Sequence, residues 1–69
     1  MHAIFLFKDQ VLGHIINASY IPEEYDYVEF DNQRYMVVRR IFRFYHLHPQ
    51  DNVGYFECVF ELEKDERIQ

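Results

Sequence analysis

Cysteine, glycine and proline are scarce in this 69-residue sequence, with one, two and two of them, and tryptophan is absent. A single cysteine cannot form a disulfide within the chain, so the core alone must stabilise the fold, which suits a reducing compartment. The two glycines, Gly13 and Gly54, stand far apart, so the sequence has no glycine-rich phosphate-binding loop. We therefore expect a cytoplasmic protein without such a loop.

Long apolar runs and an excess of basic residues are also missing. No stretch reaches the roughly 18 apolar residues needed to span a membrane, and no cationic start precedes an apolar segment with a cleavage site. We expect neither a membrane-bound nor an exported protein. Seven Lys and Arg face twelve Asp and Glu, giving a net charge of −5. This acidic balance makes nucleic acid a less favoured partner.

Aromatic residues, by contrast, are abundant, with seven Phe and six Tyr. A chain this short forms one domain and buries only about 60% of its unfolded surface. Each large aromatic side chain buries about 150–250 Å², so the aromatics first help to build a small core. We expect one β domain over residues 1–62 and a charged tail, residues 63–69, that frays or forms one helical turn.

The local pattern predicts β-strands, because Val, Ile, Phe and Tyr dominate most of the chain. Residues 3–7 are typical of a buried strand, and residues 8–10 predict a turn. Residues 11–16 fit either a strand or one face of a helix, and Gly13 and the β-branched residues favour the strand. Residues 17–26 form the longest irregular segment.

Residues 27–30 and 34–38 are predicted to form a hairpin with Asn32-Gln33 as its two-residue loop. Both strands alternate between apolar and polar residues. The expected pairs are Phe30 with Tyr35 and Val28 with Val37. These four residues would form one apolar face.

A second hairpin is predicted around a connection at residues 47–53. Pairing Tyr45 with Tyr55 also sets two arginines opposite two glutamates, and such cross-strand pairs are favourable. A slip by one residue would oppose Arg to Phe, so this register is well specified. The other expected pairs are Arg43 with Glu57, Arg39 with Glu61, Ile41 with Val59, Phe42 with Cys58, Phe44 with Phe56 and Val38 with Leu62.

The two hairpins share one long strand but disagree about which residues face inward. Odd-numbered residues face the core in the first hairpin and even-numbered ones in the second, so a bulge or bend is required, which we place in residues 38–41. Small barrels turn corners in this way. The sequence therefore predicts an all-β fold, a small five-stranded, strongly curved antiparallel sheet or partly open SH3-like barrel. The residues expected to fill its interior are Phe5, Phe7, Phe30, Phe42, Phe44, Phe56 and Phe60.

The strings Tyr20-Ile21-Pro22-Glu23-Glu24 and Val28-Glu29-Phe30-Asp31-Asn32-Gln33-Arg34-Tyr35-Met36-Val37 contain an Ile-Pro loop, a polar hairpin turn and a Tyr-x-Val strand. This arrangement is similar to short SH3-like β-barrel proteins, many of them encoded by phages and mobile elements. The resemblance covers residues 20–38 and carries no catalytic residues. It implies a small binding or inhibitory module rather than an enzyme.

The first candidate site is rich in acids and tyrosines. Residues 20–31 contain five acids, three tyrosines and no base. Tyrosines make rigid amphipathic contacts and carboxylates attract a basic partner, so we expect a protein partner here, for example one that itself binds nucleic acid. A solvated acidic loop whose tyrosines cover the barrel edge would show the same pattern. The candidate, termed the acidic–tyrosine surface, consists of Tyr20, Glu23, Glu24, Tyr25, Asp26 and Tyr27.

The arginines suggest two alternatives. Arg34 and Arg40, together with exposed aromatics, could bind nucleic acid, as some small barrels do. Alternatively, Arg40, Tyr45 and Tyr55 could form a pocket for a small ligand or nucleotide between subunits of a homo-oligomer. Strict alternation aims Arg40 at the apolar face, where it would lie on Phe60, unless the bulge carries it outside.

Metal and nucleophilic chemistry have little support. His46 and His48, with Asp51, could share a metal, but no thiolate lies nearby, and His2 and His14 stand elsewhere. Cys58 falls in the predicted core, where a thiol behaves as a small hydrophobic residue. We therefore expect no enzyme, no metal site and no cofactor.

Self-association is the last candidate. Ile41, Tyr45, Tyr55 and Val59 lie on the face opposite the predicted core, and an exposed apolar patch usually marks an interface. The first strand, residues 3–7, is a potential open edge. We expect a homodimer or another partner on this face, unless the tail or the irregular segment folds over it.

Overall fold

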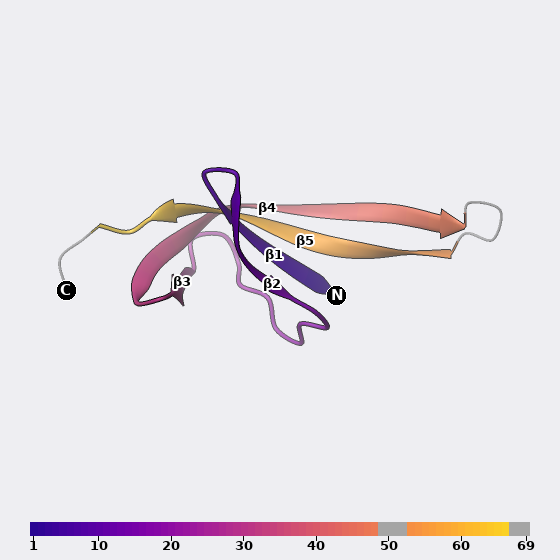
Figure 1. Ribbon diagram of the computed structural model, residues 1–69, viewed down its shortest axis with the longest axis horizontal. Coiled ribbons are helices and arrows are strands. Elements are labelled where there is room, and N and C mark those ends of the chain that lie inside the picture. Colours follow the sequence, from indigo (N-terminus) through magenta and orange to yellow (C-terminus); the bar gives the residue numbers. More distant parts are fainter. Residues whose placement is uncertain (49–52, 67–69) are drawn as a thin grey trace.

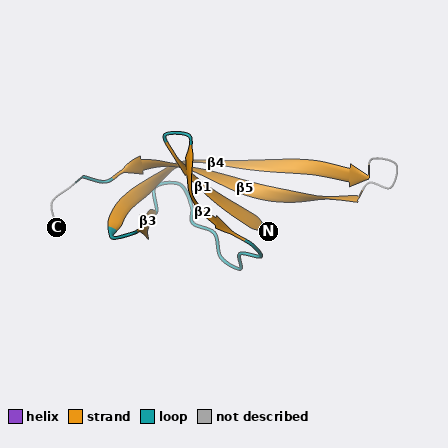
Figure 2. Cartoon of the chain, viewed as in Figure 1, coloured by secondary structure: helices purple, strands orange, loops and turns teal. Residues whose placement is uncertain are grey.

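The computed structural model describes residues 1–48 and 53–66, and within these ranges all regular elements are strands (Figures 1 and 2). They are β1 (His2–Phe7), β2 (Gln10–Ile15), β3 (Tyr27–Phe30), β4 (Gln33–His48) and β5 (Val53–Lys64). They form one sheet in the order β2-β1-β5-β4-β3, which curls strongly into a half-barrel. The predicted all-β class and curved five-stranded sheet are therefore confirmed, as is the strand over most of residues 11–16. No helix long and apolar enough to cross a membrane occurs in the described ranges.

One strand pairing differs from the antiparallel sheet that we expected. β1 runs parallel to β5, with Ala3 beside Cys58 and Phe5 beside Phe60, whereas the other three pairs are antiparallel. β1 therefore lies inside the sheet between β2 and β5, and the prediction that it is an open edge was wrong. Parallel neighbours need a long connection, and here β2, β3 and β4 intervene between them.

The loop between β3 and β4 is Asp31-Asn32, one residue earlier than predicted. Both residues have positive φ, 51° and 66°, as a type I′ turn requires, and Asp and Asn tolerate this conformation. Val28 consequently pairs with Tyr35 instead of Val37. Because this register differs from the predicted one by two residues, the same side chains still share the apolar face.

The predicted pairing of β4 with β5 is confirmed between Arg39 and Tyr45. The pairs include Tyr45 with Tyr55, Arg43 with Glu57 and Arg39 with Glu61. The register then shifts between Val37 and Arg39, inside the predicted bend region, so that Val37 and not Val38 pairs with Leu62. This bulge lets odd-numbered residues before it and even-numbered residues after it face the same side of the sheet.

The strands are longer than predicted at both ends of the hairpin. β4 continues to His48 and β5 begins at Val53, so both enter the expected connection, of which residues 49–52 lie outside the described structure. β5 ends at Lys64, and the N–H of Asp65 donates to the carbonyl of Arg34 at 2.9 Å. The folded sheet therefore extends past the expected domain boundary at residue 62. The end of the predicted tail, residues 67–69, also lies outside the described part.

The core lies on the inner face of the half-barrel. Phe5 and Phe60 stack with their ring centroids 4.7 Å apart, and Phe7 and Phe30 pack against the cluster while partly buried. The irregular segment is tied to it by the N–H of Ala18, which donates to the carbonyl of Met1 at 2.8 Å. The buried cluster comprises Ala3, Phe5, Tyr35, Val37, Cys58, Phe60 and Leu62.

Two phenylalanines were wrongly predicted to be inside. Phe42 and Phe44 are 46% and 73% exposed. Phe44 lies where β4 and β5 project beyond the start of β1, whose His2 pairs with Glu57, and Phe42 lies just inside that point, opposite Cys58. The end of this hairpin from the Phe42–Cys58 pair outward, residues 42–48 and 53–58, is termed the arm, and it forms the long extension in Figure 1. The alternation had identified the correct face, but none of the described strands covers that face at Phe42 and Phe44.

Candidate functional site

Backbone hydrogen bonds fix the acidic–tyrosine surface just before β3. The N–H of Tyr25 donates to the carbonyl of Val37 at 2.7 Å, and the N–H of Val37 donates to the carbonyl of Asp26 at 2.9 Å. The Asp26 carboxylate accepts a hydrogen bond from the N–H of Glu23 at 2.8 Å. Tyr25 has a positive φ of 73°, and its N–H bonds the chain to Val37 of β4. Asp26 thus organises the loop as well as contributing charge.

The three tyrosines of this surface are exposed to solvent, and Tyr20 and Tyr27 line a pocket. Tyr20, Tyr25 and Tyr27 are 77%, 69% and 47% exposed, and Glu23 and Glu24 are exposed as well. The pocket has a volume of about 530 Å³. Its lining consists of Phe5, Ile15, Tyr20, Pro22, Asp26, Tyr27 and Val28.

The lining combines apolar side chains with two tyrosines and one carboxylate. Tyr20, Asp26 and Tyr27, three of the six predicted residues, meet at this pocket, and Asp26 supplies its charge. Glu23, Glu24 and Tyr25 lie in the same segment but not in the lining. The site can therefore accept an apolar side chain that is followed or preceded by a cation.

The arginines proposed for nucleic acid are engaged within the chain. Arg34 forms an ion pair with Glu29 at 3.8 Å and lies over the Tyr27 ring, 5.8 Å from its centroid. Arg40 is half-buried and donates to the carbonyl of Pro22 at 3.3 Å. As strict alternation predicts, Arg40 lies on the inner face, opposite Phe60 in the ladder, and its Cζ is 5.8 Å from the centroid of the Phe42 ring.

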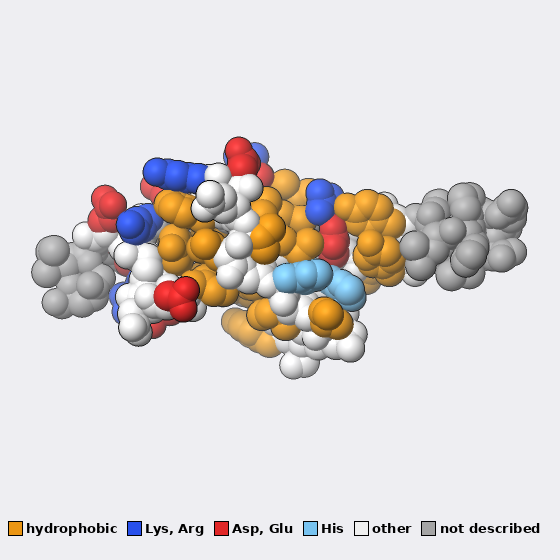
Figure 3. Space-filling view, viewed as in Figure 1, with side chains coloured by type: hydrophobic (Ala, Val, Ile, Leu, Met, Phe, Trp, Pro, Cys, Tyr) orange, Lys and Arg blue, Asp and Glu red, His pale blue; other side chains and the backbone are white. Residues whose placement is uncertain are grey.

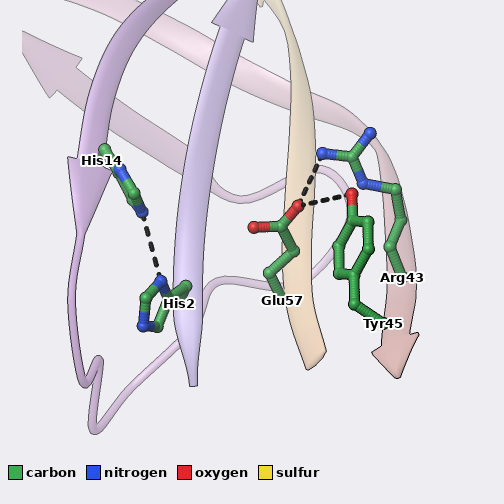
Figure 4. A network of polar contacts seen from close by, with 5 residues as sticks. All are labelled: His2, His14, Arg43, Tyr45 and Glu57. Carbon is green, nitrogen blue, oxygen red and sulfur yellow. Dashed lines mark hydrogen bonds and ion pairs between the residues drawn. The ribbon is translucent and has the colours of Figure 1, made fainter. Parts of the chain in front are cut away.

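The outer face of the sheet carries a second polar group, shown in Figure 4. Oε1 of Glu57 accepts hydrogen bonds from Nη2 of Arg43 at 2.6 Å and from Oη of Tyr45 at 3.1 Å. Glu57 is only 6% exposed, so these donors compensate the burial of its charge. The hydrogen bond to Glu57 raises the pKa of Arg43. Desolvation, followed by the bond to Glu57, raises the pKa of Tyr45.

Beside the Glu57 group lie two histidines that were not identified as a pair from the sequence. His2 Nδ1 and His14 Nε2 lie 3.4 Å apart on neighbouring strands, and the His2 ring is 5.8 Å from that of Tyr55. Figure 3 shows the histidines on one face with hydrophobic side chains. The tight turn after β1 was the available signal, because it sets β1 against β2. No cluster of three or more metal-ligating side chains occurs in the described residues, and the side chains of His46, His48 and Asp51 lie outside them.

Arg40, Tyr45 and Tyr55, which were expected to line a ligand pocket between subunits, do not share one face of the chain. Tyr45 stacks on Tyr55 with centroids 5.2 Å apart on the outer face, whereas Arg40 contacts Phe42 on the other face of β4. Alternation along a strand separates the odd and even positions in this way. Cys58 is fully buried as predicted, and burial raises the pKa of its thiol.

Comparison with known proteins gives no relative from which to transfer a role. No protein-family model, no curated protein and no solved structure matches the chain. The functional argument therefore depends on the geometry and charge of the described residues.

Proposed function

We propose that the chain is a small non-enzymatic binding module that docks a basic segment of a partner protein on its acidic–tyrosine surface. The resemblance of residues 20–38 to phage and mobile-element barrels supports an accessory or inhibitory role of this kind. The observation that carries the proposal is the pocket between Tyr20, Asp26 and Tyr27. Its apolar lining offers an anchor position, and the exposed carboxylates around it offer charge.

Charge and aromatic contacts contribute differently at such a surface. Exposed Glu23 and Glu24 would accelerate encounter with a basic partner and add salt dependence. Tyr20, the most exposed of the three tyrosines, would be covered in the complex and carry more of the affinity, since interface tyrosines are frequent energetic centres. We therefore expect different effects from removing the charges and removing the ring.

Nucleic acid is the weaker alternative, because the ion pairs of three arginines reduce the charge available for phosphates. Arg34, Arg39 and Arg43 each lie within 4 Å of a glutamate oxygen. An exposed cation that already has an anionic neighbour releases fewer counterions on binding a polyanion. If the chain is a protein-binding module, we expect no salt-dependent binding to single-stranded DNA, even at low ionic strength.

The test compares partner capture by matched variants in a lysate of the source cell. The double variant Glu23→Gln/Glu24→Gln should lower capture several-fold, most strongly at low salt. The variant Tyr20→Ser should lower it about tenfold at every salt concentration. Asp26 is left intact, because its carboxylate holds the loop.

The control is Glu63→Gln/Glu66→Gln, which removes the same charge from two exposed residues outside the segment. Its capture should equal that of the unaltered chain, and thermal unfolding should confirm that all variants fold. Equal capture by all variants, or an equal loss from both glutamate pairs, would contradict the proposed site.

A further inference from the structure

The inner face of the arm continues the core into solvent. Along this face of β5, Phe60 and Cys58 are fully buried, and Phe56 is partly buried. Opposite them on β4, exposure rises from 46% at Phe42 to 73% at Phe44. The Phe44 and Phe56 rings stack with centroids 5.1 Å apart. Among the described side chains, the core face therefore continues onto the arm as a solvent-exposed phenylalanine ladder.

No other element of the described ranges forms a second layer over the arm. The chain extends over 52 × 21 × 18 Å and has a radius of gyration of 13.9 Å, compared with about 11 Å expected for a compact domain of this length. A two-stranded ribbon alone is at best marginally stable in water, and a sheet normally buries one face against another element. Figure 1 shows the arm projecting beyond the other strands. A partner that covers its inner face would supply this missing layer.

The charges on the arm indicate which kind of partner fits. On the outer face, Arg43 and Tyr45 are already bonded to Glu57. Among the described side chains, the inner face carries charge only at Arg40, at its base, where it is bonded to the Pro22 carbonyl. A neutral phenylalanine ladder selects neither a basic nor an acidic partner, and an identical ladder can face it without opposing like charges.

The exposed phenylalanines supply roughly a third of the area that such a pairing needs. With about 150–250 Å² for each aromatic side chain, the exposed parts of Phe42 and Phe44 amount to roughly 200–300 Å² per copy. This suits the apolar centre of an interface that buries about 800 Å² per partner. The rest must come from the surrounding surface of the arm.

We propose that two copies of this chain dimerise by packing the inner faces of their arms against each other, with Phe42, Phe44 and Phe56 of each copy at the centre. Two ribbons of equal width and twist can pack about 10 Å apart, as the layers of a β-sandwich do. A twofold axis would then pair each ladder with itself. The acidic–tyrosine surface has no part in this contact, so the dimer does not depend on the proposed function.

Sedimentation and light scattering of the full chain over a concentration series test the dimer. The unaltered chain should approach twice its 8.6 kDa mass as its concentration rises. Its melting temperature should rise with concentration, because association stabilises the folded state. The variant Phe42→Ser/Phe44→Ser should dissociate at least ten times more readily and lose this concentration dependence. Circular dichroism shows whether this double variant folds. If it does not, the single variant Phe44→Ser takes its place.

The matched control is Ile41→Ser/Tyr55→Ser, which removes two exposed apolar side chains from the outer face. It should retain the dimer. A monomer at every concentration would overturn the proposal and leave the face to a different protein. A dimer that survives the phenylalanine changes, or that the outer-face changes abolish, would also overturn it.

Discussion

Gly13 and Phe30 close the open side of the half-barrel, because a Cβ added at Gly13 would lie only 2.6 Å from Cε1 of Phe30. Gly13 belongs to β2 and Phe30 to β3, the two edge strands of the sheet. These strands share no ladder, so the ring seated over the glycine is a side-chain contact between the two ends of the sheet. The glycine is needed for close approach and not for an unusual backbone conformation.

Replacing Gly13 by Ala should therefore destabilise the fold. Overpacking of this kind typically costs about 1–3 kcal/mol, and we expect a loss in that range in urea unfolding followed by circular dichroism. The paired variant Gly13→Ala/Phe30→Leu tests the cause, because a smaller side chain opposite should recover part of the loss. Strictly additive effects of the two changes would show that the contact does not close the sheet.

The turn at Asp31-Asn32 gives a second prediction. Asn32 has a φ of 66°, a conformation that costs a residue with a Cβ roughly 1–2 kcal/mol unless its side chain bonds locally. Asn32→Ala should lower the free energy of unfolding by about 1 kcal/mol, whereas Asn32→Gly should match or exceed the unaltered chain. Thermal and urea unfolding measure both. If alanine and glycine behaved alike, the left-handed turn would be in doubt.

The sequence predicts the β4–β5 register because several independent pairs agree. Arg43 with Glu57, Arg39 with Glu61 and Tyr45 with Tyr55 all require the same alignment. The conflict between odd and even inward positions likewise predicts the bulge near Val38. Such local constraints determine much of the long hairpin.

Other features could not be predicted from the sequence, because they depend on parts of the chain that are distant from each other. The alternation placed Phe44 on the core face but could not show that β1 does not extend to it. The parallel pairing of β1 with β5 has no turn or charge pattern to reveal it. The acidic–tyrosine segment was found by composition, whereas the pocket beside Tyr20 and Tyr27 needed Phe5 and Ile15 from other strands.

Cys58 should be protected from thiol reagents in the folded protein. Its side chain is fully buried, and burial raises the pKa of its thiol, which lowers the fraction of reactive thiolate. We expect modification by a chromogenic disulfide reagent to be at least a hundredfold slower than in denaturant, and to accelerate with urea. The exposed variant Tyr20→Cys provides the comparison, since its new thiol should react rapidly. Fast modification of Cys58 itself would contradict its burial.

Tyr45 should make the protein sensitive to alkaline pH. Desolvation and the hydrogen bond to Glu57 raise its pKa above the ordinary 10.0, so the unfolded chain loses this proton first as the pH rises. The associated stability is complete below pH 10 and is lost as the pH rises through the folded-state pKa. Tyr45→Phe should reduce the fall in melting temperature between about pH 9 and 11.

The unaltered chain, measured over the same pH range, is the control, because it differs from Tyr45→Phe only in the hydroxyl that donates to Glu57. An identical pH profile for Tyr45→Phe would show that folding does not raise the pKa of Tyr45.

The central place of β5 has a consequence for how the chain folds during synthesis. β1 and β4 both pair with β5, which leaves the ribosome after both of them. Until then the nascent chain can form only the β1–β2 and β3–β4 hairpins, and isolated hairpins are marginally stable. Such late, non-local closure is typical of slow folding and leaves strand edges open to wrong pairing. Pairing of β5 with β1 and β4 thus both completes the core and ends the period in which the nascent chain is most prone to aggregate.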